Sequence, residues 1–142
     1  MKSTSIRRRL AGTAAAVLVA GAGVLAAAPL AAAKANVLTI DKVSFHKPNV
    51  QVKVTYSCDP GLDHELVANA RTLGTGTHRE GNAAGTIKKD KLVCDADSHT
   101  AQVTMRPAQG TSFVKGDKIK VTVFYFDNDG FSYANETAVT VL

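Results

Sequence analysis

The sequence predicts an all-β protein that is built from short antiparallel strands and closed by one disulfide. The clearest observation is the stretch from Val50 to Cys58, in which apolar and polar residues alternate strictly. Successive side chains of a strand point to opposite faces, so this stretch should be half-buried, with Cys58 at the end of its inner face. Other short stretches alternate in the same way between residues typical of turns, and none has a convincing helical period.

Residues 1–35 are predicted to form a secretory signal peptide that is cleaved from the chain. A basic start with three consecutive arginines precedes an apolar run over residues 10–30, and small residues follow. Cleavage after Ala33 or after Ala35 fits the pattern of signal peptidase sites. The run is also long enough for a membrane anchor, but it is mostly Ala and Gly, which partition weakly into lipid. We therefore expect residues 36–142 to be secreted as one domain.

Removal of the signal peptide changes the charge of the protein from basic to neutral. The whole chain has 17 Lys and Arg against 12 Asp and Glu, and its isoelectric point is about 9.4. Five of the basic residues lie before Asn36, whereas every acidic residue lies after it, so the charges of the remaining domain balance. This balance removes the usual argument for a nucleic-acid partner. We also expect no membrane attachment after cleavage, because no later segment is long and apolar enough to span a bilayer.

The first half of the domain contains three expected strands. Residues 37–45 are apolar and β-branched with a change of alternation near Asp41, and Pro48 prevents the ladder from continuing through the next turn. The alternating stretch 50–58 follows, and Asp-Pro-Gly ends it in a turn. Residues 65–73 alternate as well, although their Leu and Ala would also suit a helix.

The second half begins with a polar loop over residues 74–85, which contains four glycines. The next segment is rich in lysine and is expected to be an edge strand, because lysines discourage pairing between exposed edges. An Asp-Asn-Asp-Gly sequence at residues 127–130 should form a hairpin turn, since these residues tolerate positive φ. In the last strand, Val139 and Val141 are expected to face inward. The expected strands of this half cover residues 87–95, 100–106, 117–127 and 131–142.

About seven short strands without a helix favour a two-sheet antiparallel sandwich of immunoglobulin-like type. The sequence departs from antibody domains in two ways. It has no Trp, and Cys94 precedes a strand instead of lying inside a late one. The disulfide should therefore join the end of the second strand to a loop in the middle of the chain.

A few residues connect this pattern with known proteins. Tyr56-Ser57-Cys58 closes an early strand, and Cys94-Asp95 is followed by His99 and an alternating strand, all behind an Ala-rich signal peptide that fits a high-GC genome. In these features the chain resembles the small secreted immunoglobulin-like proteins of actinobacteria, a domain family of unknown function. The resemblance covers most of residues 36–142. It implies a secreted β-sandwich, and because that family has no known catalytic residues, it assigns no functional role to any residue of this chain.

Cys58 and Cys94 are expected to form the disulfide. An even number of cysteines in an exported domain is usually paired. The bond would close a loop of roughly 37 residues, and the chain-entropy model assigns such a crosslink about 4 kcal/mol. This is a large share of the total stability of a small domain, which is about 5–15 kcal/mol.

The same pattern of acidic residues and a histidine follows each cysteine. The two copies are Cys58, Asp59, Asp63 and His64, and Cys94, Asp95, Asp97 and His99. A disulfide would bring both copies to one end of the domain. The four carboxylates Asp59, Asp63, Asp95 and Asp97 would then suit calcium. Reduced cysteines and the two histidines would suit zinc. The third interpretation, which export favours, is a structural disulfide flanked by polar turns.

Four aromatic residues flank the expected hairpin turn at residues 127–130. They are Phe124, Phe126, Phe131 and Tyr133. Aromatic side chains near the end of a sandwich often bind partners. The alternative is that these four side chains cover an open edge of the sandwich or its second face. This hairpin is the second place where a binding site is expected.

The sequence as a whole favours a secreted, non-enzymatic binding or structural module without a cofactor. It contains no acid–base or nucleophile pair with recognisable spacing. The expected partner is an extracellular protein, a glycan or a cell-surface component. The alternative is a calcium-binding extracellular protein, or a small hydrolase that uses the acidic residues and histidines near the disulfide.

Overall fold

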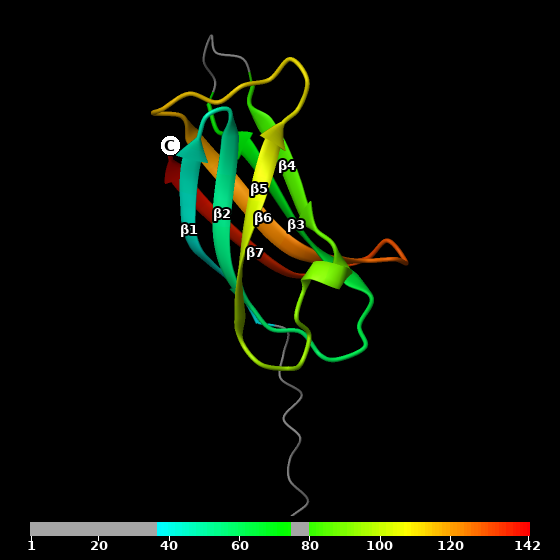
Figure 1. Ribbon diagram of the computed structural model, residues 1–142. Helices are drawn as coiled ribbons and strands as arrows, with labels where there is room; N and C mark the ends of the chain where they lie inside the picture. Colours follow the sequence, from blue (N-terminus) through cyan, green and yellow to red (C-terminus); the bar gives the residue numbers. More distant parts are fainter. Residues whose placement is uncertain (1–36, 75–79) are drawn as a thin grey trace, which may run out of the picture. The chain divides into compact units, whose positions relative to one another are not determined.

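The computed structural model describes residues 37–74 and 80–142, and this part of the chain is all-β, as predicted (Figure 1). The predicted signal peptide and residues 75–79 of the predicted loop lie outside the described residues. The strands are β1 (Leu38–His46), β2 (Asn49–Tyr56), β3 (His64–Thr72), β4 (Asn82–Ile87), β5 (His99–Pro107), β6 (Lys118–Asp127) and β7 (Ser132–Val141). One short 3₁₀ helix, η1 (Lys89–Lys91), lies between β4 and β5.

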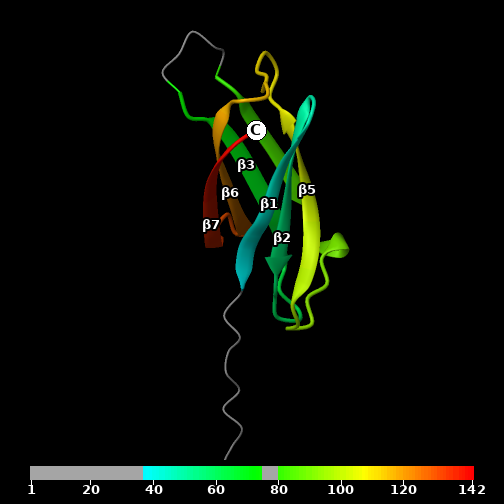
Figure 2. The same cartoon turned by 90° about the vertical axis from the view of Figure 1, so that its left-hand side faces the viewer.

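The seven strands described form one sheet in the order β1-β2-β5-β4-β3-β6-β7, and every neighbouring pair is antiparallel. The junction of β4 and β5 is short, because only Ala83–Pro107 and Ala84–Arg106 pair there. In Figure 1, β3, β6 and β7 pass behind β2 and β5, and in the turned view they lie to the left of these strands (Figure 2). β1 and β7 approach each other without pairing, so the sheet curls round its buried face and is nearly closed.

A single apolar core fills the inside of the curled sheet. The alternation that predicted the strand at Val50–Cys58 is confirmed, since Val50, Val52, Val54 and Tyr56 are all buried. β2 lies between β1 and β5, and Val52 pairs with Val103 of β5 across the core face. β6 carries the matching set from the other side of the core, which is Ile119, Val121, Val123 and Tyr125.

Two irregularities in strand pairing decide which residues face the core. The first lies at Asp41, as predicted, where the register of β1 against β2 shifts between Ile40 and Lys42. The Asp41 carboxylate accepts a hydrogen bond of 2.9 Å from the Thr55 hydroxyl on β2. This bond holds the extra residue against the neighbouring strand.

The second irregularity lies in β7 and makes one prediction wrong. Ala134 has a positive φ of 49°, and together with Asn135 it stands opposite Phe124 alone. The extra residue reverses the alternation of the strand beyond it. Val139 and Val141, which were expected inside, are therefore 54% and 63% exposed on the outward face.

The segment between β3 and β5 also differs from the prediction. β4 occupies the end of the expected loop and ends at Ile87, and the rest of the expected edge strand, residues 88–95, contains η1 and irregular chain. β4 consists mainly of small residues because β5 crosses it closely. A side-chain carbon on Gly85 would lie 2.4 Å from the carbonyl oxygen of Thr104. Small residues at this crossing look like loop sequence, which explains the error.

Candidate functional site

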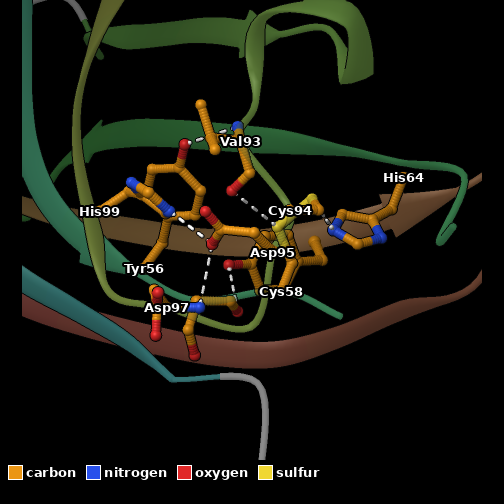
Figure 3. A network of polar contacts seen from close by, with 10 residues as sticks. Tyr56, Cys58, His64, Val93, Cys94, Asp95, Asp97 and His99 are labelled. Atoms are coloured by element: carbon orange, nitrogen blue, oxygen red, sulfur yellow. Dashed lines mark hydrogen bonds and ion pairs between the residues drawn. A yellow bond between two sulfur atoms is a disulfide. The ribbon is translucent and has the colours of Figure 1, made fainter. Parts of the chain in front are cut away.

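The disulfide lies at one end of the domain and joins two loops. Cys58 follows β2 and Cys94 precedes β5, and their Cα atoms are 4.7 Å apart. The predicted pairing of these cysteines is confirmed. Two further bonds fasten the same loops, because Ala96 donates its N–H to the carbonyl of Cys58 and Val93 donates its N–H to the Tyr56 hydroxyl, both at 3.0 Å (Figure 3). The loop before β5 is therefore fixed at several points.

His64, the first residue of β3, is buried beside the disulfide. Its side chain is 1% exposed, and its Nε2 lies 3.8 Å from Cys94 Sγ (Figure 3). The ring packs edge-on against Tyr125 and Tyr133, with centroids 4.7 and 5.8 Å away. The buried Nδ1 has no hydrogen-bond partner within the part of the chain that the structure describes.

Burial lowers the pKa of His64, because the imidazolium would lose its water in the core. The carboxylates of Asp63 and Asp127 act in the opposite direction, but their effect on this pKa is smaller. The ring is therefore held neutral at pH 7. His64 accordingly belongs to the core of the domain beside the disulfide.

The neutral state of His64 predicts a loss of stability in mild acid. The unfolded chain takes up a proton near pH 6.5, whereas the folded chain resists it, so the free energy of unfolding should fall as the pH drops below about 6.5. His64→Phe, which keeps an aromatic ring in the core, should flatten this dependence below about pH 6.5. Urea unfolding at a series of pH values measures it. His46→Gln serves as a control at an exposed position. An equally steep dependence in the His64→Phe protein would show that another group is responsible.

The four aspartates of the predicted calcium site lie in different surroundings. Asp95 Oδ1 accepts a hydrogen bond from the N–H of Asp97 at 3.0 Å and lies 2.7 Å from His99 Nε2. The bond with His99 lowers the pKa of Asp95, and the bond with the Asp97 N–H acts in the same direction. Asp63 forms a 2.7 Å ion pair with Lys89 of η1. Asp59 is half-buried, and Asp97 is exposed.

Neither predicted set of metal ligands is gathered in one place. Within residues 37–74 and 80–142, the one group of three or more potential ligands with mutually close donor atoms is Cys58, His64 and Cys94, within 4.8 Å. Its two sulfur atoms form the disulfide. His99 is not in this group and bonds with Asp95 instead. The calcium and zinc sites remain predictions that would need the loops to rearrange.

The four aromatic residues of the β6–β7 hairpin have three different environments. Tyr133 is partly buried against the core, with its ring 5.6 Å from that of Tyr125. Phe124 is half-buried on the outward face, in register with Val67 of β3. Phe126 and Phe131 are 41% and 69% exposed. We call these last two residues the aromatic tip.

Asp127 gives the hairpin a defined shape. Its carboxylate accepts hydrogen bonds from the N–H groups of Asp129 and Phe131, at 3.0 and 2.8 Å. Gly130 adopts a positive φ of 89°, as the predicted turn requires. The side-chain amide of Asn128 donates to Asp63, so the hairpin is tied to the turn before β3. The aromatic tip is therefore presented on a braced turn.

The structure also contains a feature that the sequence analysis missed. Arg71, Arg106 and Lys120 line a hollow of about 470 Å³ on the outward face of the sheet. We call this hollow the basic groove. The three residues are far apart in the sequence, and the strand order β5-β4-β3-β6 brings them together. The net charge of the domain does not show where its charges gather. Only the order of the strands in the sheet shows that these three residues are neighbours.

Comparison with protein-family models, with curated proteins and with solved structures gave no match. Among the residues that the structure describes, no helix is long and apolar enough to cross a membrane.

Proposed function

We propose that this chain is a secreted, non-enzymatic module that binds an extracellular protein, a glycan or a cell-surface component through its aromatic tip. The observation that carries the proposal is the exposure of two phenylalanines on either side of one braced turn. Water-exposed Phe is costly to keep, and aromatic side chains dominate the energy of many interfaces. Asp127 orders the turn in advance, so little conformational entropy would be lost on binding.

The proposed architecture is an immunoglobulin-like sandwich of two layers, in the manner of the small secreted actinobacterial proteins that the chain resembles. One layer would comprise β1, β2 and β5, and the other β4, β3, β6 and β7. The short junction of two residue pairs between β4 and β5 supports this division, as does the single core shared by both sets of strands. Such a fold presents its turns at the two ends, where partners usually bind.

The polar groups near the disulfide support a structural role better than a catalytic one. The Asp95–His99 pair joins the loop before β5 to the first residue of that strand, and Asp63–Lys89 links the turn before β3 to η1. The Asp95 carboxylate also accepts a hydrogen bond from the N–H of Asp97, and this bond stabilises the loop that contains both residues. These contacts give Asp63, Asp95 and His99 structural roles that require no reaction.

The proposal predicts that the aromatic tip can be removed without loss of the fold. Phe131→Ala should change the unfolding free energy by no more than about 0.5–1 kcal/mol, because its side chain is 69% exposed. Phe126 is 41% exposed, so Phe126→Ala should cost somewhat more, about 1–2 kcal/mol, and still leave the protein folded. Each should weaken retention on actinobacterial cell-envelope material by roughly tenfold or more, the loss typical of an interface aromatic. Retention is measured by co-sedimentation over a range of protein concentrations.

Val141→Ala is the matched control for these variants. Val141 is an apolar residue on β7 with an exposure close to that of Phe131, and it lies at the opposite end of that strand from the hairpin. The Val141→Ala protein should be retained like the wild type. Variants of Phe126 and Phe131 that unfold would show that the two rings are core. Folded variants with unchanged retention would place the binding surface elsewhere.

A further inference from the structure

We infer that the basic groove binds a sugar that carries an anionic group, either a carboxylate or a phosphate. This inference goes beyond the proposed function, since it assigns a second site with its own class of ligand. It does not depend on the aromatic tip, because different residues form the two surfaces.

Three strands deliver the cations of the groove to one face of the sheet. Arg71 of β3 stands directly opposite Lys120 of β6, and Arg106 of β5 pairs with Ala84 of β4. Neighbouring strands are about 4.8 Å apart, so the three residues lie within roughly 15 Å across the sheet. All three occupy outward positions, because the residues that alternate with them are buried.

The described part of the chain places no negative charge beside the three cations of the groove. Like charges directly opposite each other on neighbouring strands destabilise a sheet, as Arg71 and Lys120 must do here. Among the residues that the structure describes, no acidic side chain lines the groove, and none of the ion pairs involves Arg71, Arg106 or Lys120. An anion in the groove would offset this repulsion, and the guanidinium groups match the oxygen geometry of carboxylates and phosphates.

The remaining lining of the groove suits the hydroxyl groups of a sugar. Asn69, Asn82 and Thr122 offer amide and hydroxyl groups that both donate and accept hydrogen bonds. Small residues form part of its wall, Ala84 among them, and leave the space open. Its volume of about 470 Å³ falls within the range of small-molecule sites, about 300–1,000 Å³.

An apolar surface lies next to the groove on the same face. Asn69 and Thr122 are in register, and the next outward pair towards the hairpin is Val67 and Phe124. A sugar ring held by its anionic group at Lys120 could lay its C–H face on this aromatic ring. Cations, hydrogen-bonding groups and an aromatic ring on one face therefore point to an anionic sugar.

The inference is tested by titrating the purified protein with small probes and following the backbone amide resonances by NMR. Glucuronic acid and glucose 1-phosphate are the anionic probes, and glucose and inorganic phosphate are the controls, each up to about 10 mM. At least one anionic sugar should shift the amides of Asn69, Ala84 and Thr122. It should also bind at least fivefold more tightly than glucose and inorganic phosphate. The two anionic probes separate carboxylate from phosphate recognition.

Charge-neutralising variants show whether the groove itself is responsible. Lys120→Gln and Arg71→Gln should weaken binding roughly tenfold, the effect typical of one lost charged hydrogen bond. Both should keep or raise the melting temperature, because they relieve the repulsion between these residues. Lys53→Gln, at an exposed position on β2, is the matched control and should bind like the wild type.

Three outcomes would overturn the inference. One is the absence of localised shifts with either anionic sugar. Another is equal binding of glucose or of inorganic phosphate, which would remove the sugar assignment. The third is an equal effect of Lys53→Gln and Lys120→Gln, which would indicate general attraction between charges. Phe131→Ala should leave the binding of these probes unchanged. A failure of the proposed function at the aromatic tip can therefore be told apart from a failure of the inference on the basic groove.

Discussion

Replacing both Cys58 and Cys94 with alanine should lower the free energy of unfolding by about 4 kcal/mol. The disulfide spans 36 positions of sequence and encloses β3, β4 and η1, so its loss frees a large segment of the unfolded chain. For a domain of this size the loss corresponds to a melting temperature lower by about 15–30 °C. Denaturant unfolding of the wild-type and double-variant proteins at pH 7 measures the difference.

A comparison with the reduced wild-type protein keeps this prediction specific. The wild-type protein unfolded in the presence of a reductant should resemble the double variant, because both lack the same crosslink. Cys58 is buried, so the alanine variant also loses some packing that the reduced wild type keeps. A loss of less than about 1 kcal/mol would contradict the role given to the disulfide. The hydrogen bonds between its loops would then be enough to hold the two loops together.

Gly85→Ala should be the most damaging single-methyl substitution in the sheet. The added carbon would lie 2.4 Å from the Thr104 carbonyl oxygen and 3.0 Å from a methyl group of Val103. The nearest obstacle is backbone, so β5 itself would have to move away from β4. We expect a loss of about 2–3 kcal/mol or more, at the upper end of the range for overpacking.

Gly74→Ala is the matched control for this substitution. Apart from Gly74 itself and its chain neighbours, no atom of the described residues lies within 4 Å of the carbon that the substitution would add, and Gly74 does not have a positive φ. Its effect on the unfolding free energy should stay within about 0.5 kcal/mol. If Gly85→Ala were as mild as Gly74→Ala, β4 and β5 would not cross as closely as the structure has them.

The strands were predictable wherever one face of a strand is buried in the core. Strict alternation located β2, β5 and β6, because the core accepts every second side chain. The pattern failed at β7, where the extra residue at Ala134 moved the two valines beyond it outward. It also failed at β4, where a close crossing requires small residues that resemble a loop.

The candidate sites were predictable only where they are local in the sequence. The hairpin at Asp127 and the aromatic tip lie within a few residues of each other, and the pairing of the two cysteines followed from their number and the expected export. The sequence did not indicate that Tyr133 packs on the core or that His64 is buried. The basic groove depends on the order of strands in the sheet, which the alternation of residues within each strand does not reveal.

The central claim is that the aromatic tip is the binding surface of this module. It is tested most directly by comparing the retention of two double variants on actinobacterial cell-envelope material. One carries Phe126→Ala and Phe131→Ala, and the other carries Val139→Ala and Val141→Ala, a pair of comparable exposure on β7. Retention should fall by about two orders of magnitude for the first variant and stay at the wild-type level for the second. Equal retention of both folded proteins would contradict the claim.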